Sequence, residues 1–267
     1  MPFPDSPRVI YQRNPLEKVI CQLRFPPILK IDTQIPSDFQ DIIRGEYPLY
    51  SETKEMAVEL PPEITSQLPP EVVNSLPFPT INRMNYLFET SDENWTVNLT
   101  NNFVALTCKR YDRWENFREH FTLPFNALLQ VYKPAFFSRI GLRYVDVIRR
   151  SKLGLEDANW HELIQPYISG ILSSQEIKIK VVQGSISKEE VKLDDGHSIV
   201  RIVHGIGISK INSETIFLID CDFFIENERT EINHAFEKLD YFNHWGRRLF
   251  RWCITDRLHN AMDPQPL

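Results

Sequence analysis

Apolar and polar residues alternate in two stretches that lie about half the chain apart, at 20–26 (ICQLRFP) and 139–148 (RIGLRYVDVI). A period of two predicts β-strands that bury one face and expose the other. Both stretches contain Leu-Arg followed by an aromatic residue. If the leucines and aromatic residues face the core, Arg24 and Arg143 must point to the opposite side of the sheet.

Other segments continue this alternation, and four show apolar residues at steps of three and four, which is typical of helices. Strands are predicted at 84–90, 95–100, 103–111, 176–183, 198–208 and 215–224. Helices are predicted at 37–47, 112–133, 157–172 and 230–259, with Pro124 kinking the second and Pro166 interrupting the third. A polar hairpin tip is expected at 184–197.

These elements occur in the same order in both halves of the chain. Residues 1–18 form an N-terminal arm, and 19–139 and 140–267 each follow the order β-α-β-β-β-α. The pattern predicts an α+β protein in which two pseudo-repeated units share one curved antiparallel sheet with helices on one face. This arrangement resembles TATA-binding-protein-like or fused ferredoxin-like folds, although no DNA-binding motif of the former is present.

Residues 50–80 form a proline-rich insert in the first half, in which Leu-Pro recurs at Leu60, Leu68 and Leu76. Proline removes a backbone donor and fixes φ, so this insert is predicted to contain neither a central strand nor a long helix. A surface loop and a partner-binding arm are both compatible with it.

Composition narrows the class of protein. The chain has 267 residues, a net charge of −6 and a hydrophobic fraction of 42%, values that suit a globular protein with a core. The acidic balance argues against binding nucleic acid through a general basic field. No secretory signal and no membrane-spanning apolar run are visible. Four scattered cysteines lack zinc-site spacing, so we expect buried thiols, no cofactor and a cytoplasmic location.

The predicted open face of the sheet is the first candidate site. It would carry Gln22, Arg24 and Arg143, and a guanidinium group is suited to bidentate recognition of carboxylate or phosphate. This suggests binding of an anionic ligand or an acidic partner segment. The alternative is that each arginine pairs with an acid on a neighbouring strand.

Asp220 and Asp222 are two residues apart on a predicted strand and therefore lie on one face. Paired carboxylates at this spacing can hold Mg²⁺ in phosphoryl-transfer enzymes. No phosphate-binding glycine loop accompanies them. Pairing of these acids with strand arginines is the other interpretation.

The last predicted helix is basic, since it contains Arg247, Arg248 and Arg251 interleaved with Trp245 and Trp252. Such a patch could bind nucleic acid or an acidic protein. Cations near a helix C-terminus are also favourable with the helix dipole, which would explain them without a ligand.

The run that contains Tyr11, Asn14-Pro15-Leu16 and residues 19–26 resembles the first hallmark of a sporadically distributed bacterial family that has no assigned activity. Residues 139–144 (RIGLRY) resemble its second hallmark. The resemblance covers most of the chain and brings no catalytic residues. It implies a genomic setting near mobile elements or phage defence.

Together these observations favour a non-enzymatic binding or regulatory protein, the partner-binding component of a phage-defence or toxin–antitoxin-like operon. A divalent-metal phosphoryl-transfer or nuclease-like enzyme using Asp220 and Asp222 is one alternative. A nucleic-acid-binding protein is the other. A protein partner is expected, and the oligomeric state is not predicted.

Overall fold

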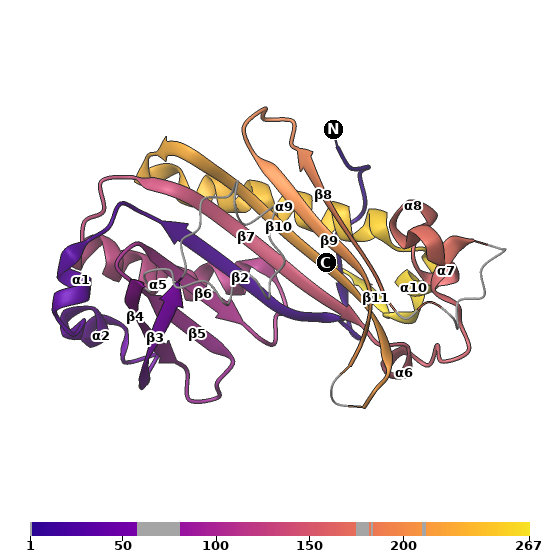
Figure 1. Ribbon diagram of the computed structural model, residues 1–267, viewed down its shortest axis with the longest axis horizontal. Coiled ribbons are helices and arrows are strands. Elements are labelled where there is room, and N and C mark those ends of the chain that lie inside the picture. Colours follow the sequence, from indigo (N-terminus) through magenta and orange to yellow (C-terminus); the bar gives the residue numbers. More distant parts are fainter. Residues whose placement is uncertain (1, 58–80, 175–181, 183, 210–211) are drawn as a thin grey trace.

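The computed structural model describes residues 2–57, 81–174, 182, 184–209 and 212–267 (Figure 1). It confirms the α+β class, with helices and a nine-stranded antiparallel sheet in the order β3-β4-β5-β6-β2-β7-β10-β9-β8. The strands are β2 (Leu16–Arg24), β3 (Leu49–Ala57), β4 (Ile81–Glu89), β5 (Trp95–Leu99), β6 (Phe103–Cys108), β7 (Phe137–Ile148), β8 (Ser185–Lys192), β9 (Ile199–Ile208) and β10 (Thr215–Thr230).

Strands β2 and β7 pair with each other at the centre of the sheet, with Cys21 opposite Leu142. From this centre the strands run β2-β6-β5-β4-β3 in one direction and β7-β10-β9-β8 in the other. The first strand of each half therefore lies beside the last strand of the same half. The two halves share the order of the four strands next to the centre, but the first half has a fifth, edge strand β3 that the predicted β-α-β-β-β-α order lacks. Their origin by duplication stays a prediction.

The two long helices, α5 (Trp114–Val131) and α9 (Ala235–Cys253), lie on one face of the sheet (Figure 1). α9 packs across β7 and β10, and α5 packs against β6. On β2 the buried residues Val19, Cys21 and Leu23 alternate with Gln22 and Arg24. The alternation therefore places the apolar side chains of β2 under the helices and its polar ones on the opposite face.

Aromatic side chains fill much of the space between the helices and the sheet. Trp114, Phe117, Phe121 and Phe125 recur along one side of α5 and are buried. The ring of Phe125 meets that of Phe236, near the start of α9, with centroids 4.9 Å apart. Such aromatic contacts join the two helices over the core. Within the described ranges, no helix is long and apolar enough to cross a membrane.

The predicted helix 230–259 is divided in the structure. A short 3₁₀ turn, η3 (Ile232–His234), precedes α9, and α10 (Asp256–Ala261) follows it. Ile254 is extended and forms a β-bridge with Ile164, and the side chain of Thr255 accepts a hydrogen bond from the backbone N–H of Leu258. Thr255 is therefore the N-cap of a separate helix. Apolar residues keep a helical spacing on both sides of Ile254, so the sequence did not reveal the break there.

Three further segments differ in detail from the sequence-based expectation. The helix predicted at 157–172 is divided into α7 (Trp160–Leu163), α8 (Pro166–Ser169) and a 3₁₀ turn, η1 (Gly170–Ser173), because proline cannot continue a helix interior. The expected hairpin tip at 184–197 contains strand β8, and the predicted insert begins with strand β3. The Leu-Pro repeats and most of 176–183 lie outside the described residues.

Short elements complete the chain. They are the helices α1 (Leu29–Thr33), α2 (Ser37–Ile43) and α6 (Arg150–Leu153), and a two-stranded sheet of β1 (Val9–Tyr11) and β11 (Pro264–Pro266). The four cysteines are buried and free, as predicted.

The N-terminal arm is folded onto helix α9. The Phe3 ring is buried, with centroids 6.1 Å from Trp245 and 5.3 Å from Trp252. The carboxylate of Asp5 accepts a hydrogen bond of 2.6 Å from Arg248. Because β2 begins at Leu16, the arm is shorter than the predicted 1–18.

Candidate functional site

Arg143 is paired with an acid of the neighbouring strand, as the alternative interpretation described, whereas Arg24 bonds to an amide on its own strand. Arg143 donates to both carboxylate oxygens of Asp220, from Nε at 2.7 Å and from Nη2 at 2.5 Å. Arg24 donates from Nε to Oε1 of Gln22 at 3.0 Å. The structure thus places Gln22, Arg24 and Arg143 on the same face, with Arg143 held by an acid of the neighbouring strand.

Arg139, which the sequence-based interpretation did not single out, occupies the centre of this face. Its Nη2 donates to both carboxylate oxygens of Asp222, at 2.9 and 2.8 Å, and its Nη1 donates to Gln22 at 3.3 Å. A Cβ atom on Gly141 would lie 2.2 Å from that Nη1. The glycine of the second hallmark therefore lets the guanidinium lie flat across the sheet.

The pairs extend across five strands. Arg201 on β9 donates to Glu190 on β8 at 2.8 Å, and its Nη1 lies 4.0 Å from Asp222. The guanidinium carbons of Arg139 and Arg201 lie 5.0 and 5.1 Å from the centroid of the Phe224 ring. We call the set of Gln22, Arg139, Arg143, Glu190, Arg201, Asp220 and Asp222 the ion-pair row. Its three arginines and three carboxylates compensate one another's charges, so the main role of the ion-pair row is to stabilise the sheet.

This pairing bears directly on the predicted metal site. Both oxygens of Asp220 and of Asp222 already accept hydrogen bonds from arginine. Among the residues that the structure describes, no three His, Cys, Asp or Glu side chains gather in a way that could hold a metal ion. The arrangement matches the arginine-pairing alternative and offers a cation no set of ligands there.

The basic residues of α9 are also engaged. Arg248 is buried against Asp5 and Trp245, and Arg247 donates to the backbone carbonyl of Ser6 at 2.9 Å. Arg251 donates to the carbonyl of Ile254 at 3.2 Å and pairs with Asp256. The three arginines hold the arm and the helix end, and the structure does not bring them together as an exposed patch.

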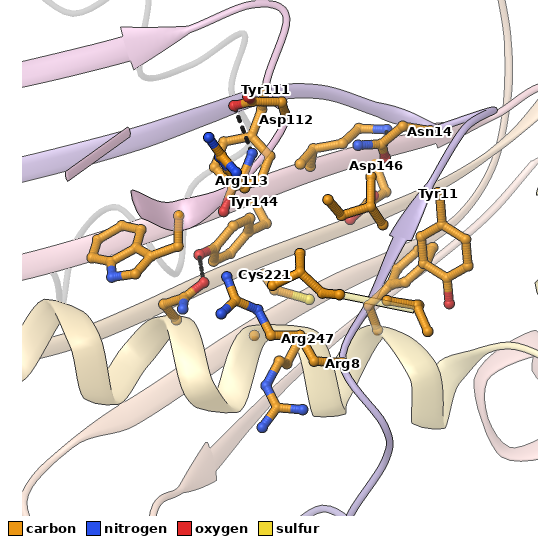
Figure 2. A pocket seen from close by; sticks show the side chains of 18 residues that line it. Arg8, Tyr11, Asn14, Tyr111, Asp112, Arg113, Tyr144, Asp146, Cys221 and Arg247 are labelled. Atoms are coloured by element: carbon orange, nitrogen blue, oxygen red, sulfur yellow. Dashed lines mark hydrogen bonds between the residues drawn. The ribbon is translucent and has the colours of Figure 1, made fainter. Parts of the chain in front are cut away.

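A cavity of about 130 Å³ lies under α9. Its walls come from the N-terminal arm, strands β7 and β10, helix α9 and the residues that lead into α5 (Figure 2). Five aromatic side chains contribute to these walls, namely Tyr11, Tyr111, Trp114, Tyr144 and Phe250. A concave, mostly apolar space with a few polar groups is the usual form of a small-molecule site.

Asp146 lines this cavity from strand β7. Its side chain lies on the helix-covered face with Tyr144, and only 6% of the residue is exposed. No hydrogen bond or ion pair to its carboxyl group is found among the described residues. Burial raises the pKa of the Asp146 carboxyl to about 8, and the charge of Asp220 adds to this effect.

The polar groups around Asp146 are occupied elsewhere. The Tyr144 hydroxyl donates to Oδ1 of Asn243 at 3.0 Å, and the Tyr11 hydroxyl lies 2.8 Å from Nδ1 of His259. Figure 2 shows Asp146 among Tyr11, Tyr144 and Cys221. Its neighbours therefore pack around the carboxyl group without satisfying it, so one strong acceptor faces the cavity.

Local backbone features shape the space. The register between β2 and β7 shifts between Leu16 and Lys18, so a bulge lies beside Asp146, which is opposite Leu16. Gly246 in the middle of α9 allows the Tyr144 ring to approach, because a Cβ atom there would lie 2.8 Å from that ring. The helix thus passes close over the strand at one end of the cavity.

The rim of the cavity is charged, in contrast to its interior. Arg8 pairs with Glu115 at 2.6 Å, and Arg247 reaches the arm at Ser6. Asp112 and Arg113 lie at the same rim. The rim thus carries three arginines, Arg8, Arg113 and Arg247, against the two carboxylates of Asp112 and Glu115, while Asp146 is the acid that lies deeper in the cavity.

Asp146 was missed at the level of sequence although a signal was present. In the alternation of residues 139–148, Asp146 falls on the buried face together with Leu142 and Tyr144. A lone acid in such a series marks a buried polar group that needs a reason. Both hallmark runs also contribute to the cavity, through Tyr11, Asn14, Leu16 and Tyr144.

No protein-family model matches the chain, and no curated protein matches it either. The family resemblance described above therefore stays a prediction.

Proposed function

We propose that this chain is a non-enzymatic binding protein whose cavity beside Asp146 holds a small organic molecule. The observation that carries the proposal is a half-open cavity of about 130 Å³ lined by a mostly buried carboxyl group that has no hydrogen-bond partner among the described residues. Burying such a group unpaired is unfavourable, and native proteins seldom keep one without a role. A perturbed acid in a cleft is a recognised indication of a functional site.

The chemistry of the neighbouring groups supports binding rather than nucleophilic catalysis. Burial raises the pKa of the Cys221 thiol well above its ordinary value, so the sulfur next to Asp146 stays protonated and unreactive. Burial likewise raises the pKa of Tyr11 to about 12. These groups offer apolar contact and fixed dipoles, which position a ligand but do not attack it.

The position of the N-terminal arm suggests how a protein partner could detect whether the cavity holds a ligand. Residues 8–16 form part of the cavity wall, and the arm is attached to α9 through Phe3 and Asp5. A ligand that contacts this wall would stabilise the attached arm over a detached one. In this proposal a protein partner binds the attached arm and the detached arm with different affinity. The partner belongs to the phage-defence or toxin–antitoxin-like setting that the resemblance implies.

The proposal is tested by screening single-ring compounds with ligand-observed NMR. Cys221→Leu places extra bulk in the cavity, and Val147→Leu makes a comparable addition on the opposite face of the sheet as the matched control. We expect compounds that bind the wild type and Val147→Leu and that lose binding to Cys221→Leu. Equal binding to all three proteins, or binding to none, would contradict the proposed function.

A further inference from the structure

We propose that the ligand of this cavity is a single-ring aromatic compound that carries a protonated amine or amidine, with its N–H groups bound to the carboxylate of Asp146. The inference rests on the proposed function and adds the chemical class of the ligand. It depends on the size of the cavity, on its aromatic walls and on the one unpartnered acceptor inside it.

The size of the cavity sets the size of the ligand. Its volume of about 130 Å³ is close to that of engineered protein cavities of about 150 Å³ that bind benzene. One six-membered ring with a short substituent therefore fits inside it, whereas most of a dinucleotide or a peptide segment would have to lie outside. A substituent longer than a few atoms would have to pass the rim formed by Arg8 and Glu115.

The walls favour a flat ring with a positive charge. Tyr11, Tyr111, Tyr144 and Trp114 present aromatic surfaces to the cavity from three separate segments of the chain. Aromatic rings pack against one another in tilted or edge-to-face arrangements, and the faces of tyrosine and tryptophan attract cations. An aliphatic anion would gain neither of these interactions.

The polar groups that line the cavity indicate that the ligand supplies N–H donors. The side-chain oxygen of Asn14 accepts the backbone N–H of Leu16 at 3.1 Å, and that of Asn243 accepts the hydroxyl of Tyr144. The Asp146 carboxylate has no such partner among the residues described, so it is the acceptor that a ligand would satisfy. Amidinium presents two parallel N–H groups, which match the two oxygens of one carboxylate.

A cation binds the ionised form of Asp146, which gives the interaction a pH signature. With a pKa of about 8, roughly one carboxyl in eleven is ionised at pH 7 and ten in eleven at pH 9. Since affinity scales with the competent fraction, binding of a cation should strengthen about tenfold over this range.

Other groups around the cavity do not produce this signature. The titratable or charged ones are Arg8, Tyr11, Tyr111, Asp112, Arg113, Tyr144, Cys221 and Arg247. Burial raises the pKa values of the three tyrosines and of the cysteine, so they keep their protons. Arginines keep their charge. Burial lowers the pKa of His259 behind Tyr11, so this histidine is neutral throughout the range.

The test compares benzamidine, benzamide and benzoate by isothermal titration calorimetry against the full chain. Benzamidine is expected to bind, with benzamide and benzoate at least tenfold weaker, and Asp146→Asn should lose about tenfold or more of the benzamidine affinity. Asp157→Asn, which alters an exposed carboxyl group, should leave the affinity unchanged.

The wild type alone supplies a second readout that does not depend on a variant that folds. Benzamidine should bind about tenfold more tightly at pH 9 than at pH 7. Affinity independent of pH, or benzamide or benzoate binding as tightly as benzamidine, would overturn the ligand class. If neutral rings bind and Cys221→Leu blocks them, the proposed function stands while this inference fails; if no ring binds, both fail.

Discussion

Asp146→Asn replaces the buried carboxyl group by an amide of nearly the same shape and removes its titration. In the folded protein, burial holds the pKa of this carboxyl at about 8, whereas its ordinary value is 3.8. Between these values the unfolded chain binds fewer protons at this residue than the folded chain. The free energy of unfolding of the wild type should therefore fall as the pH rises through this window and level off above about pH 8.

The magnitude follows from the two pKa values. They differ by about 4 units, and each unit corresponds to ~1.4 kcal/mol, so the full effect approaches about 6 kcal/mol. Water that enters the cavity solvates the carboxylate and reduces this figure. We expect the stability of Asp146→Asn relative to wild type to increase by about 2–4 kcal/mol between about pH 5 and pH 8.

Urea unfolding followed by tryptophan fluorescence at unit pH intervals measures this difference. The matched control is Asp157→Asn, whose carboxyl group is exposed in the loop between α6 and α7. The control should follow the pH profile of the wild type, while the Asp146→Asn profile diverges from it. Parallel profiles for all three proteins would refute the reasoning, because they would show that Asp146 keeps one pKa in both states.

Three further predictions concern the packing around the sheet. Arg139→Ala and Asp222→Ala should show a coupling energy of about 1–3 kcal/mol in a double-mutant cycle, because both side chains are mostly buried; simple additivity would count against the pair. Gly141→Ala should displace the flexible end of the Arg139 side chain at a cost of about 1 kcal/mol in urea, and an equal loss in the Arg139→Ala background would exclude the proposed clash. Phe3→Ala should cost about 2–4 kcal/mol and shift the fluorescence of Trp245, and an unchanged unfolding midpoint would show that the arm is not attached.

The sequence predicted what depends on local periodicity. The alternation within 20–26 and 139–148 identified the strands that pair at the centre of the sheet, and the α+β class followed from the order of elements. The spacing of aromatic residues identified α5 almost to its ends. These features are local because each strand or helix must bury one continuous side.

Features that depend on distant partners were not predictable in this way. Arg248 and Asp5 are 243 positions apart, so nothing near Arg248 in the sequence shows that its charge is buried against the arm. Asp146 could have been noticed as an acid on an apolar face. That it lacks a partner depends on the arm, on β10 and on α9 together, and only the folded arrangement shows this.

The protonation of Asp146 is measured most directly by NMR, from the carboxyl ¹³C shift of this residue across a pH titration with and without benzamidine. The free protein should titrate with a midpoint near pH 8, and the midpoint should fall when benzamidine is added. A midpoint near the ordinary 3.8 that benzamidine leaves unmoved would show that the carboxyl group is already satisfied and anchors no ligand.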